Sequence, residues 1–115
     1  MIKDNHIKAV GSIKKAVEKI KNSLPFTVKV EVEVENLQQL KEAADTEADV
    51  IMLDNMDVDE MKKAVKFIDG RFVLEASGNV TEENVRSIAA AGVDIISIGA
   101  LTHSVKALDI SLRFI

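Results

Sequence analysis

The sequence has no cysteine, tryptophan or tyrosine, and only one proline among its 115 residues. Without cysteine, the chain can form neither disulfides nor thiolate metal sites, which suits a cytoplasmic protein. Four phenylalanines supply all of its large aromatic side chains. They are too few for the aromatic platforms on which single-stranded nucleic acids stack.

Basic residues are outnumbered, 15 against 19 acidic ones, and the formal net charge is −4. A nucleic-acid-binding domain needs a basic surface, so we expect no nucleic-acid partner. No apolar run approaches the roughly 20 residues that span a bilayer, and the start, MIKDNHIKAV, lacks the apolar core of a signal peptide. The balance of 47% apolar and 30% charged residues predicts a soluble, cytoplasmic chain without a membrane partner.

What the sequence does contain is a regular alternation of strand-type and helix-type segments. Alternating or continuous apolar residues predict strands at 28–36, 49–53, 71–76 and 94–98, and a first strand that ends in the segment IKDNH. Apolar residues at helical spacing predict helices at 12–22, 36–44, 57–70 and 81–92, with Asn36, Asp57 and Thr81 as N-caps. The tail 108–115 has the pattern of a further strand or of a helix-like cap.

The alternation predicts an α/β fold in which parallel strands are covered by helices, as one domain over residues 1–115. It does not distinguish an open doubly wound sheet from a barrel. In both architectures ligands bind at the carboxyl ends of the strands. We therefore examine the residues that follow each strand.

The strand VKVEVEVEN, residues 28–36, alternates valine with charged residues. Successive side chains of a strand point to opposite faces, so the valines share one face and the charged residues share the other. We expect the valines to lie under the helices. Glu33, near the carboxyl end, is then the carboxylate expected to contact a ligand, whereas Lys29 and Glu31 lie deeper and pair with each other or with neighbouring strands.

Glu33 and Asp54 follow neighbouring strands and are expected to face one cavity. Paired carboxylates suit Mg²⁺, often through water, or ribose hydroxyl groups. The alternative is that both are simply solvated residues at strand ends. A glycosidase-like acid and base pair is a weaker interpretation, because no aromatic residue is present to stack on a sugar.

Two short glycine-containing turns follow the last two strands: SGN at 77–79 and IGALTHS at 98–104. Exposed backbone N–H groups in such turns form anion sites, most often for phosphate. The alternative is that Gly78 and Gly99 only permit tight turns. Near the N-terminus, Lys3 and His6 beside Asp4 are expected to form a compact cationic cluster. With only two histidines in the chain, a zinc site is improbable.

Five segments in this order resemble quinolinate phosphoribosyltransferase, the carboxylating nicotinate-nucleotide pyrophosphorylase. They are IKDNHI, VEVEVENLQQL, DVIMLDNM, LEASGNVT and AGVDIISIGALTHSVKALDISL. The resemblance implies a (β/α) barrel, open rather than fully eight-stranded, with a separate N-terminal α+β domain. It also implies the Mg²⁺-dependent conversion of quinolinate and phosphoribosyl pyrophosphate to nicotinate mononucleotide, pyrophosphate and CO₂ in NAD synthesis.

Carried over by residue, the resemblance places Lys3 against the quinolinate carboxylates. It places Glu33 and Asp54 toward the ribose and its Mg²⁺-bound pyrophosphate, as catalytic residues and as metal ligands acting directly or through water. Two loops are implied to hold the 5′-phosphate; they comprise Ser77, Gly78 and Asn79, together with Gly99 and Ala100, with His103 next to them.

Compared with this family, the chain corresponds to the C-terminal part of the barrel domain, and the N-terminal domain and first barrel strands are not part of it. Quinolinate is a dianion that should bind guanidinium groups, yet the three arginines, Arg71, Arg86 and Arg113, do not follow any strand. We therefore expect no activity from the chain alone.

Three interpretations stay open: a half-barrel fragment, a subunit completed by a second polypeptide, and a non-catalytic phosphate-binding module. A paralogue associated with molybdenum transport shares the same layout. Because a partial barrel has exposed strand edges, we expect self-association, pairing with a complementary half-barrel chain, or rearrangement to an open flavodoxin-like sandwich.

Overall fold

The computed structural model describes residues 1–103, 105 and 107–114. Four parallel strands form one sheet in the order β1-β2-β3-β4. They are β1 (Glu31–Val34), β2 (Val50–Asp54), β3 (Val73–Ser77) and β4 (Ile95–Ile96). Ile2 adds a single parallel bridge to Val32 outside β1. The chain is therefore built from consecutive βα units, as the alternation predicted.

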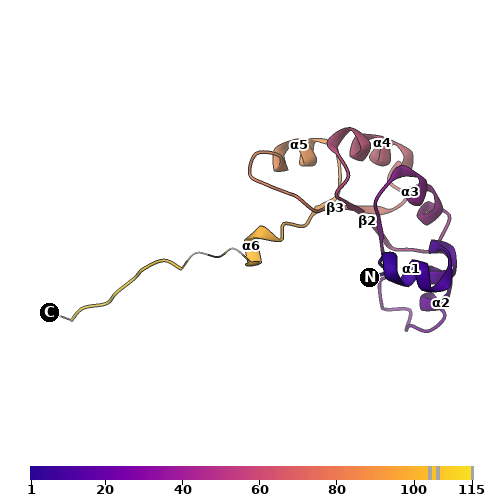
Figure 1. Cartoon of the computed structure of the whole chain (residues 1–115), viewed down its shortest axis with the longest axis horizontal. Coiled ribbons are helices and arrows are strands. Elements are labelled where there is room, and N and C mark those ends of the chain that lie inside the picture. Colours follow the sequence, from indigo (N-terminus) through magenta and orange to yellow (C-terminus); the bar gives the residue numbers. More distant parts are fainter. Residues whose placement is uncertain (104, 106, 115) are drawn as a thin grey trace.

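The helices lie along the convex side of the curved sheet (Figure 1). They are α1 (Asp4–Val10), α2 (Ile13–Lys21), α3 (Leu37–Ala44), α4 (Val58–Ile68), α5 (Val85–Ala90) and α6 (Ala100–His103). A parallel sheet with helices on one side is a partial barrel. A flavodoxin-like sandwich would need helices on both faces, and in the described part of the chain the second face has none.

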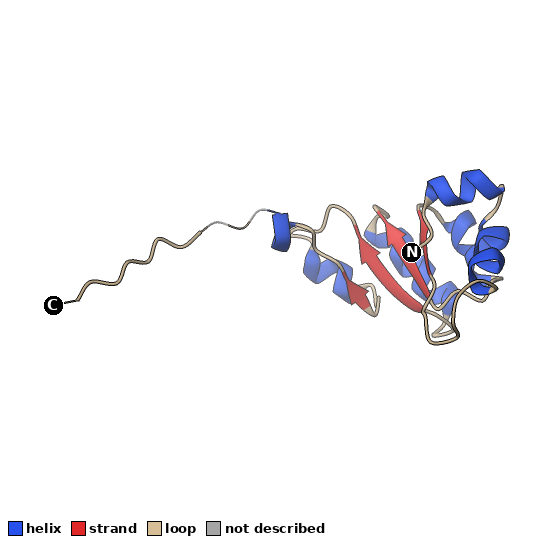
Figure 2. Ribbon diagram, turned by 90° about the horizontal axis from the view of Figure 1, so that it is seen from below, coloured by secondary structure: helices blue, strands red, loops and turns tan. Residues whose placement is uncertain are grey.

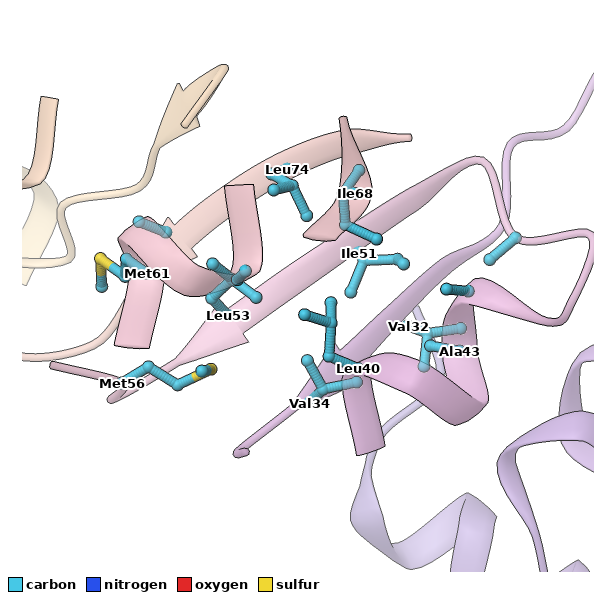
Figure 3. Packing of buried hydrophobic residues seen from close by; sticks show 14 of the residues in the cluster. Val32, Val34, Leu40, Ala43, Ile51, Leu53, Met56, Met61, Ile68 and Leu74 are labelled. Carbon is cyan, nitrogen blue, oxygen red and sulfur yellow. The ribbon is translucent and has the colours of Figure 1, made fainter. Parts of the chain in front are cut away.

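The core lies between the sheet and these helices. Val32 and Val34 of β1 are fully buried there, with Leu40 of α3 and Ile51 and Leu53 of β2 (Figure 3). The prediction that the valines of the alternating strand lie under the helices is confirmed, with one exception at its start. Val28 lies before β1 and is 42% exposed.

Local capping explains where α3 and α4 begin. The Asn36 side chain accepts hydrogen bonds from the backbone N–H groups of Gln38 and Gln39 at 3.0 and 2.9 Å. Asp57 accepts from Glu60 at 2.8 Å in the same way. Both satisfy N–H groups that the helix itself leaves unpaired, as the sequence predicted.

Two of the predicted boundaries are wrong. Thr81 does not cap α5, because residues 82–84 form a turn and the helix begins at Val85 after Asn84. The strand predicted to end in IKDNH is reduced to a one-residue bridge at Ile2, and α1 begins within that segment at Asp4. A polar turn precedes α5, and a helix replaces the end of the predicted first strand.

The tail differs from its prediction. Residues 108–114 form neither helix nor strand, and they lead away from the body of the molecule as an extended segment (Figure 2). Leu108, Ile110, Leu112 and Phe114 are all at least 78% exposed. The apolar alternation is typical of a strand, but among the described residues it pairs with no sheet edge. Ile115, the last residue of that prediction, lies outside the described residues, as does Ser104 of the segment IGALTHS.

Among the described residues, every helix is too short or too polar to cross a membrane.

Candidate functional site

The register of the sheet brings the predicted carboxylates to one face. Glu33 on β1, Met52 on β2 and Glu75 on β3 are partners across the strands, and Asp54 is the partner of Ser77. Partners in a parallel sheet share a face, and residues two apart along a strand lie on that face about 6.6 Å from each other. Glu33 and Asp54 therefore both lie at the carboxyl end of the uncovered, concave face.

Lys3 joins this group through an ion pair. Its ammonium Nζ lies 3.2 Å from Oε2 of Glu33, whose side chain is only 12% exposed against 55% for Lys3. The parallel bridge of Ile2 to Val32 positions Lys3 beside Glu33, since Glu33 donates its N–H to the Ile2 carbonyl at 3.0 Å. A cation and a carboxylate are thus paired beside the rim of the sheet.

The predicted cationic cluster of Lys3 and His6 beside Asp4 is wrong. His6 uses Nδ1 to accept the Lys3 backbone N–H at 3.0 Å, which caps α1. Asp4 is paired with Lys8 at 2.7 Å, and that hydrogen bond lowers the pKa of the Asp4 carboxyl. Lys3 and Lys8 are therefore paired with different carboxylates, Glu33 and Asp4, and His6 contacts the backbone of Lys3 rather than Asp4.

Glu31 lies deeper on the same face and has an unusual environment. Its Oε1 is buried without a hydrogen-bond partner. Desolvation raises the pKa of the Glu31 carboxyl, and the nearby charge of Glu75 raises it further. Glu75 in turn accepts a hydrogen bond from the Ser97 hydroxyl at 2.5 Å. Two carboxyl groups this close are most stable when one of them holds a proton.

Of the two pairings expected for Lys29, the one with Glu31 does not occur and the one with the neighbouring strand segment does. Lys29 contacts Asp49, with 3.2 Å between Nζ and Oδ1, and Asp49 also binds Lys21 and the Val30 backbone N–H. These contacts lie before β2 begins, so they lie at the amino end of the sheet. They hold α2 against β1 rather than face a ligand.

The two turns after β2 and β3 are joined by side-chain amides. Asn55 donates to Oδ2 of Asp54 at 2.9 Å and accepts from the Asn79 side chain at 2.8 Å. Asn55, Gly78 and Asn79 all have positive φ, of 54°, 86° and 50°. A side chain at Gly78 would lie 2.3 Å from the Asn55 amide oxygen. Gly78 is therefore required for close approach as well as for its backbone conformation.

The second predicted phosphate loop, with Gly99, Ala100 and His103, follows β4 and enters the single-turn α6. A side chain at Gly99 would contact the His103 ring at 2.6 Å, so that ring folds back on its own loop. Among the described residues, no hydrogen bond or ion pair links this loop to the turn 77–79. The two loops follow adjacent strands without touching.

A magnesium site made only of protein groups is not present in the part of the chain that the structure describes, where no three acidic or histidine side chains converge. Mg²⁺ commonly binds through one or two carboxylates and takes its other ligands from water and substrate phosphates. Glu33 and Asp54 fit that second mode, in which the substrate supplies most of the ligands.

The sequence places Asn55 and Glu75 at strand ends without assigning them a role, and it does not single out Ser97. Strand alternation could have identified the second, because Glu75 and Ser77 must share a face of β3. The contacts of Asn55 and Ser97 depend on register between strands that lie over 20 residues apart in sequence.

Comparison with known proteins identifies the family to which the chain belongs. A family model described as "Quinolinate phosphoribosyl transferase, C-terminal domain" matches residues 1–113. The probable carboxylating nicotinate-nucleotide pyrophosphorylase of Methanocaldococcus jannaschii is 46% identical over the whole chain, which covers 43% of that protein. The chloroplastic enzyme of Arabidopsis thaliana is 49% identical over 98% of the chain and 38% of its own length.

The crystal structure of NadC from Streptococcus pyogenes has the same fold, with a TM-score of 0.92 and 44% sequence identity. That comparison covers 99% of this chain and 40% of the NadC chain. The chain therefore spans less than half the length of these relatives.

Proposed function

Because the chain belongs to the family of the quinolinate phosphoribosyl transferase C-terminal domain, we propose that it carries the phosphoribosyl-binding half of a carboxylating nicotinate-nucleotide pyrophosphorylase. That enzyme joins quinolinate to phosphoribosyl pyrophosphate and yields nicotinate mononucleotide, pyrophosphate and CO₂ in NAD synthesis. One observation carries the proposal: the Lys3–Glu33 ion pair, Asp54 and the turn 77–79 all lie at the carboxyl end of the sheet.

The proposed roles follow from charge. Departure of pyrophosphate leaves positive charge on the ribose, and the carboxylates of Glu33 and Asp54 stabilise that charge electrostatically. Lys3, now paired with Glu33, exchanges that partner for a carboxylate of quinolinate when the acid binds. The exchange leaves the negative charge of Glu33 free for the ribose.

Phosphate groups bind the turn of Ser77, Gly78 and Asn79 and the loop of Gly99, Ala100 and His103. Positive φ in the first turn supports this role, because successive backbone N–H groups then point outward as an anion site. Glu33 and Asp54 would hold Mg²⁺, directly or through water, and the ion would supply charge neutralisation to the leaving pyrophosphate.

The chain alone is proposed to be inactive. Arg71 donates to the carbonyls of Ile68 and Phe67 at the amino end of β3, and Arg113 lies in the extended tail. Neither reaches the carboxyl end, where a dianion would need bidentate guanidinium partners. We propose that those arginines come from the parts of the enzyme that lie outside this chain. The cytoplasmic location stays a prediction, since one plant relative is named chloroplastic and another mitochondrial.

Calorimetric titration with phosphoribosyl pyrophosphate and Mg²⁺ tests the proposal. We expect binding by the unmodified chain, at least 10-fold weaker binding by Asp54→Asn because it removes one of two carboxylates, and unchanged binding by the matched surface variant Asp59→Asn. Equal binding by all three proteins, or none by the unmodified chain, contradicts the proposed site. Binding that persists while the complete protein shows no phosphoribosyltransferase activity would favour a non-catalytic phosphate-binding module.

A further inference from the structure

Asn55 connects the Asp54 carboxylate to the turn 77–79 by three hydrogen bonds. Its side-chain N–H donates to Oδ2 of Asp54 at 2.9 Å, and its amide oxygen accepts from Asn79 at 2.8 Å. Its backbone N–H donates to the Ser77 carbonyl at 2.9 Å. One residue thus spans the carboxyl ends of two neighbouring strands.

Backbone conformation sets up this bridge. Asn55 and Asn79 both have left-handed φ, of 54° and 50°, a region that asparagine tolerates better than most residues. Gly78 between Ser77 and Asn79 leaves room for the Asn55 amide, whose oxygen would otherwise lie 2.3 Å from a β-carbon. Glycine at position 78 is therefore required for the two turns to pack closely while asparagine occupies position 55.

The network continues beyond the turn. Asn84 donates to the Asn79 carbonyl at 2.9 Å and accepts from the Thr81 N–H at 2.8 Å, immediately before α5. The 77–79 turn is thereby held from both sides. Asn55 has a distinct part in it, because a carboxamide can donate to a carboxylate and accept from an amide at the same time.

We infer that Asn55 is a positioning residue, which holds the Asp54 carboxylate in one orientation relative to the phosphate-binding turn. The inference rests on the proposed function for the role of Asp54 and of the turn. Binding of a phosphate group at the turn and the orientation of the carboxylate that faces the ribose are then coupled through one amide.

A ligand-free measurement tests the bridge. In the isotope-labelled chain, Asp54→Ala should shift the side-chain amide resonances of Asn79, because Asn55 transmits the change. In an Asn55→Gly background the same substitution should leave Asn79 unchanged. Glycine adopts the left-handed conformation without strain, so the fold is retained. Asp69→Gly, another left-handed residue at the end of α4, is the matched control and should preserve the coupling.

Asn55→Asp separates the two halves of the bridge. Aspartate still accepts from Asn79 but cannot donate to Asp54, so the Asn79 resonances should stay near their original positions while the response to Asp54→Ala disappears. A response that survives in Asn55→Gly or in Asn55→Asp overturns the inference.

Ligand binding supplies the second measurement. Affinity for phosphoribosyl pyrophosphate with Mg²⁺ should fall about 2- to 10-fold in Asn55→Gly, the effect expected for one hydrogen bond, and stay unchanged in Asp69→Gly. Inorganic phosphate should shift the Asp54 side-chain carbon in the unmodified chain but not in Asn55→Gly. Failure of phosphate to bind even the unmodified chain counts against the proposed function, while the ligand-free coupling still supports the positioning of Asp54. Equal affinities in all three proteins overturn the inference.

Discussion

Individual residues on and beside the sheet meet very different electrostatic surroundings. Asp49 accepts hydrogen bonds from Lys21, Val30 and Lys29, and the Lys21 bond contributes most to lowering its pKa to about 2. Glu31 has no such donors, and desolvation raises its pKa. The two carboxyl groups therefore make opposite contributions to stability as the pH changes.

Asp49→Ala should destabilise the chain by about 1–3 kcal/mol at pH 7, because it leaves the Val30 N–H and the Lys21 ammonium without their acceptor. The native pKa is lower than the unfolded value, so this stabilisation is complete above pH 4 and is lost as the pH falls toward 2. Urea unfolding at pH 7 and pH 2.5 measures both effects. If Asp49→Ala lost as much stability at pH 2.5 as at pH 7, the ionised Asp49 carboxylate would not be the source of the stabilisation.

Glu31→Gln should stabilise the chain at pH 7 by up to about 1 kcal/mol, a small value because solvent screens the pair. A native pKa raised above the unfolded value means that the folded state holds the proton more tightly. Glu31 therefore reduces the free energy of unfolding as the pH rises above 4.5, the ordinary pKa of a glutamate. The variant should lose that pH dependence between about pH 4.5 and 7. Thermal unfolding across this range checks it, with the exposed Glu35→Gln as the control.

Gly78→Ala should lower the free energy of unfolding by about 1–3 kcal/mol, because alanine at φ 86° is strained and its β-carbon collides with Asn55. In an Asn55→Gly background only the backbone strain remains, so the cost should be smaller. A double-mutant cycle from denaturant unfolding gives the coupling between the two positions. A coupling of zero would mean that the collision is relieved by movement of the turn.

At the scale of elements, capping by single side chains decides where helices begin. Asn36 caps α3 through two hydrogen bonds. Thr81 lies outside α5, which begins four residues later at Val85. Both positions fit the sequence pattern of an N-cap. The turn 82–84 distinguishes them, because it connects Val80, which is buried, to a helix that must lie on the core.

Asn36→Ala should therefore destabilise the chain by about 0.5–2 kcal/mol, the usual cost of removing a cap. Thr81→Ala should cost only a few tenths of a kcal/mol, as for most exposed surface positions. Circular dichroism during urea unfolding compares the two variants. Equal losses would show that Thr81 holds α5 as firmly as Asn36 holds α3.

At the scale of the molecule, the sheet has helices on one face and carboxylates on the other, and an apolar tail extends from its end (Figures 1 and 2). The tail residues Leu108, Ile110, Leu112 and Phe114 are exposed. Exposed alternating apolar residues are typical of segments that pair with another sheet edge.

Leu108→Asp combined with Leu112→Asp should leave the unfolding midpoint unchanged, because neither side chain packs on the core. If the chain self-associates as predicted, the same variant should lower the mass measured by light scattering. The matched pair Lys14→Asp and Lys15→Asp, on exposed positions of α2, should change neither quantity. A lower unfolding midpoint in the tail variant would show that the tail packs against the fold.

The sequence by itself determined the alternation of strands and helices from α2 to β4, the capping of α3 and α4, and the burial of the valines of β1. These features depend on residues two to four positions apart, whose relative placement the backbone geometry of one element sets. The strand-end positions of Glu33, Asp54 and the turn 77–79 could be predicted for the same reason.

Only the tertiary structure decided which groups meet. Strand register and the one-sided packing of the helices pair Lys3 with Glu33 and Lys29 with Asp49, bring Glu31 close to Glu75, and place Asn55 against Asn79. Those partners lie 20 to 44 positions apart in the sequence. Local pattern cannot specify such contacts, because each depends on how two separately formed elements align across the sheet.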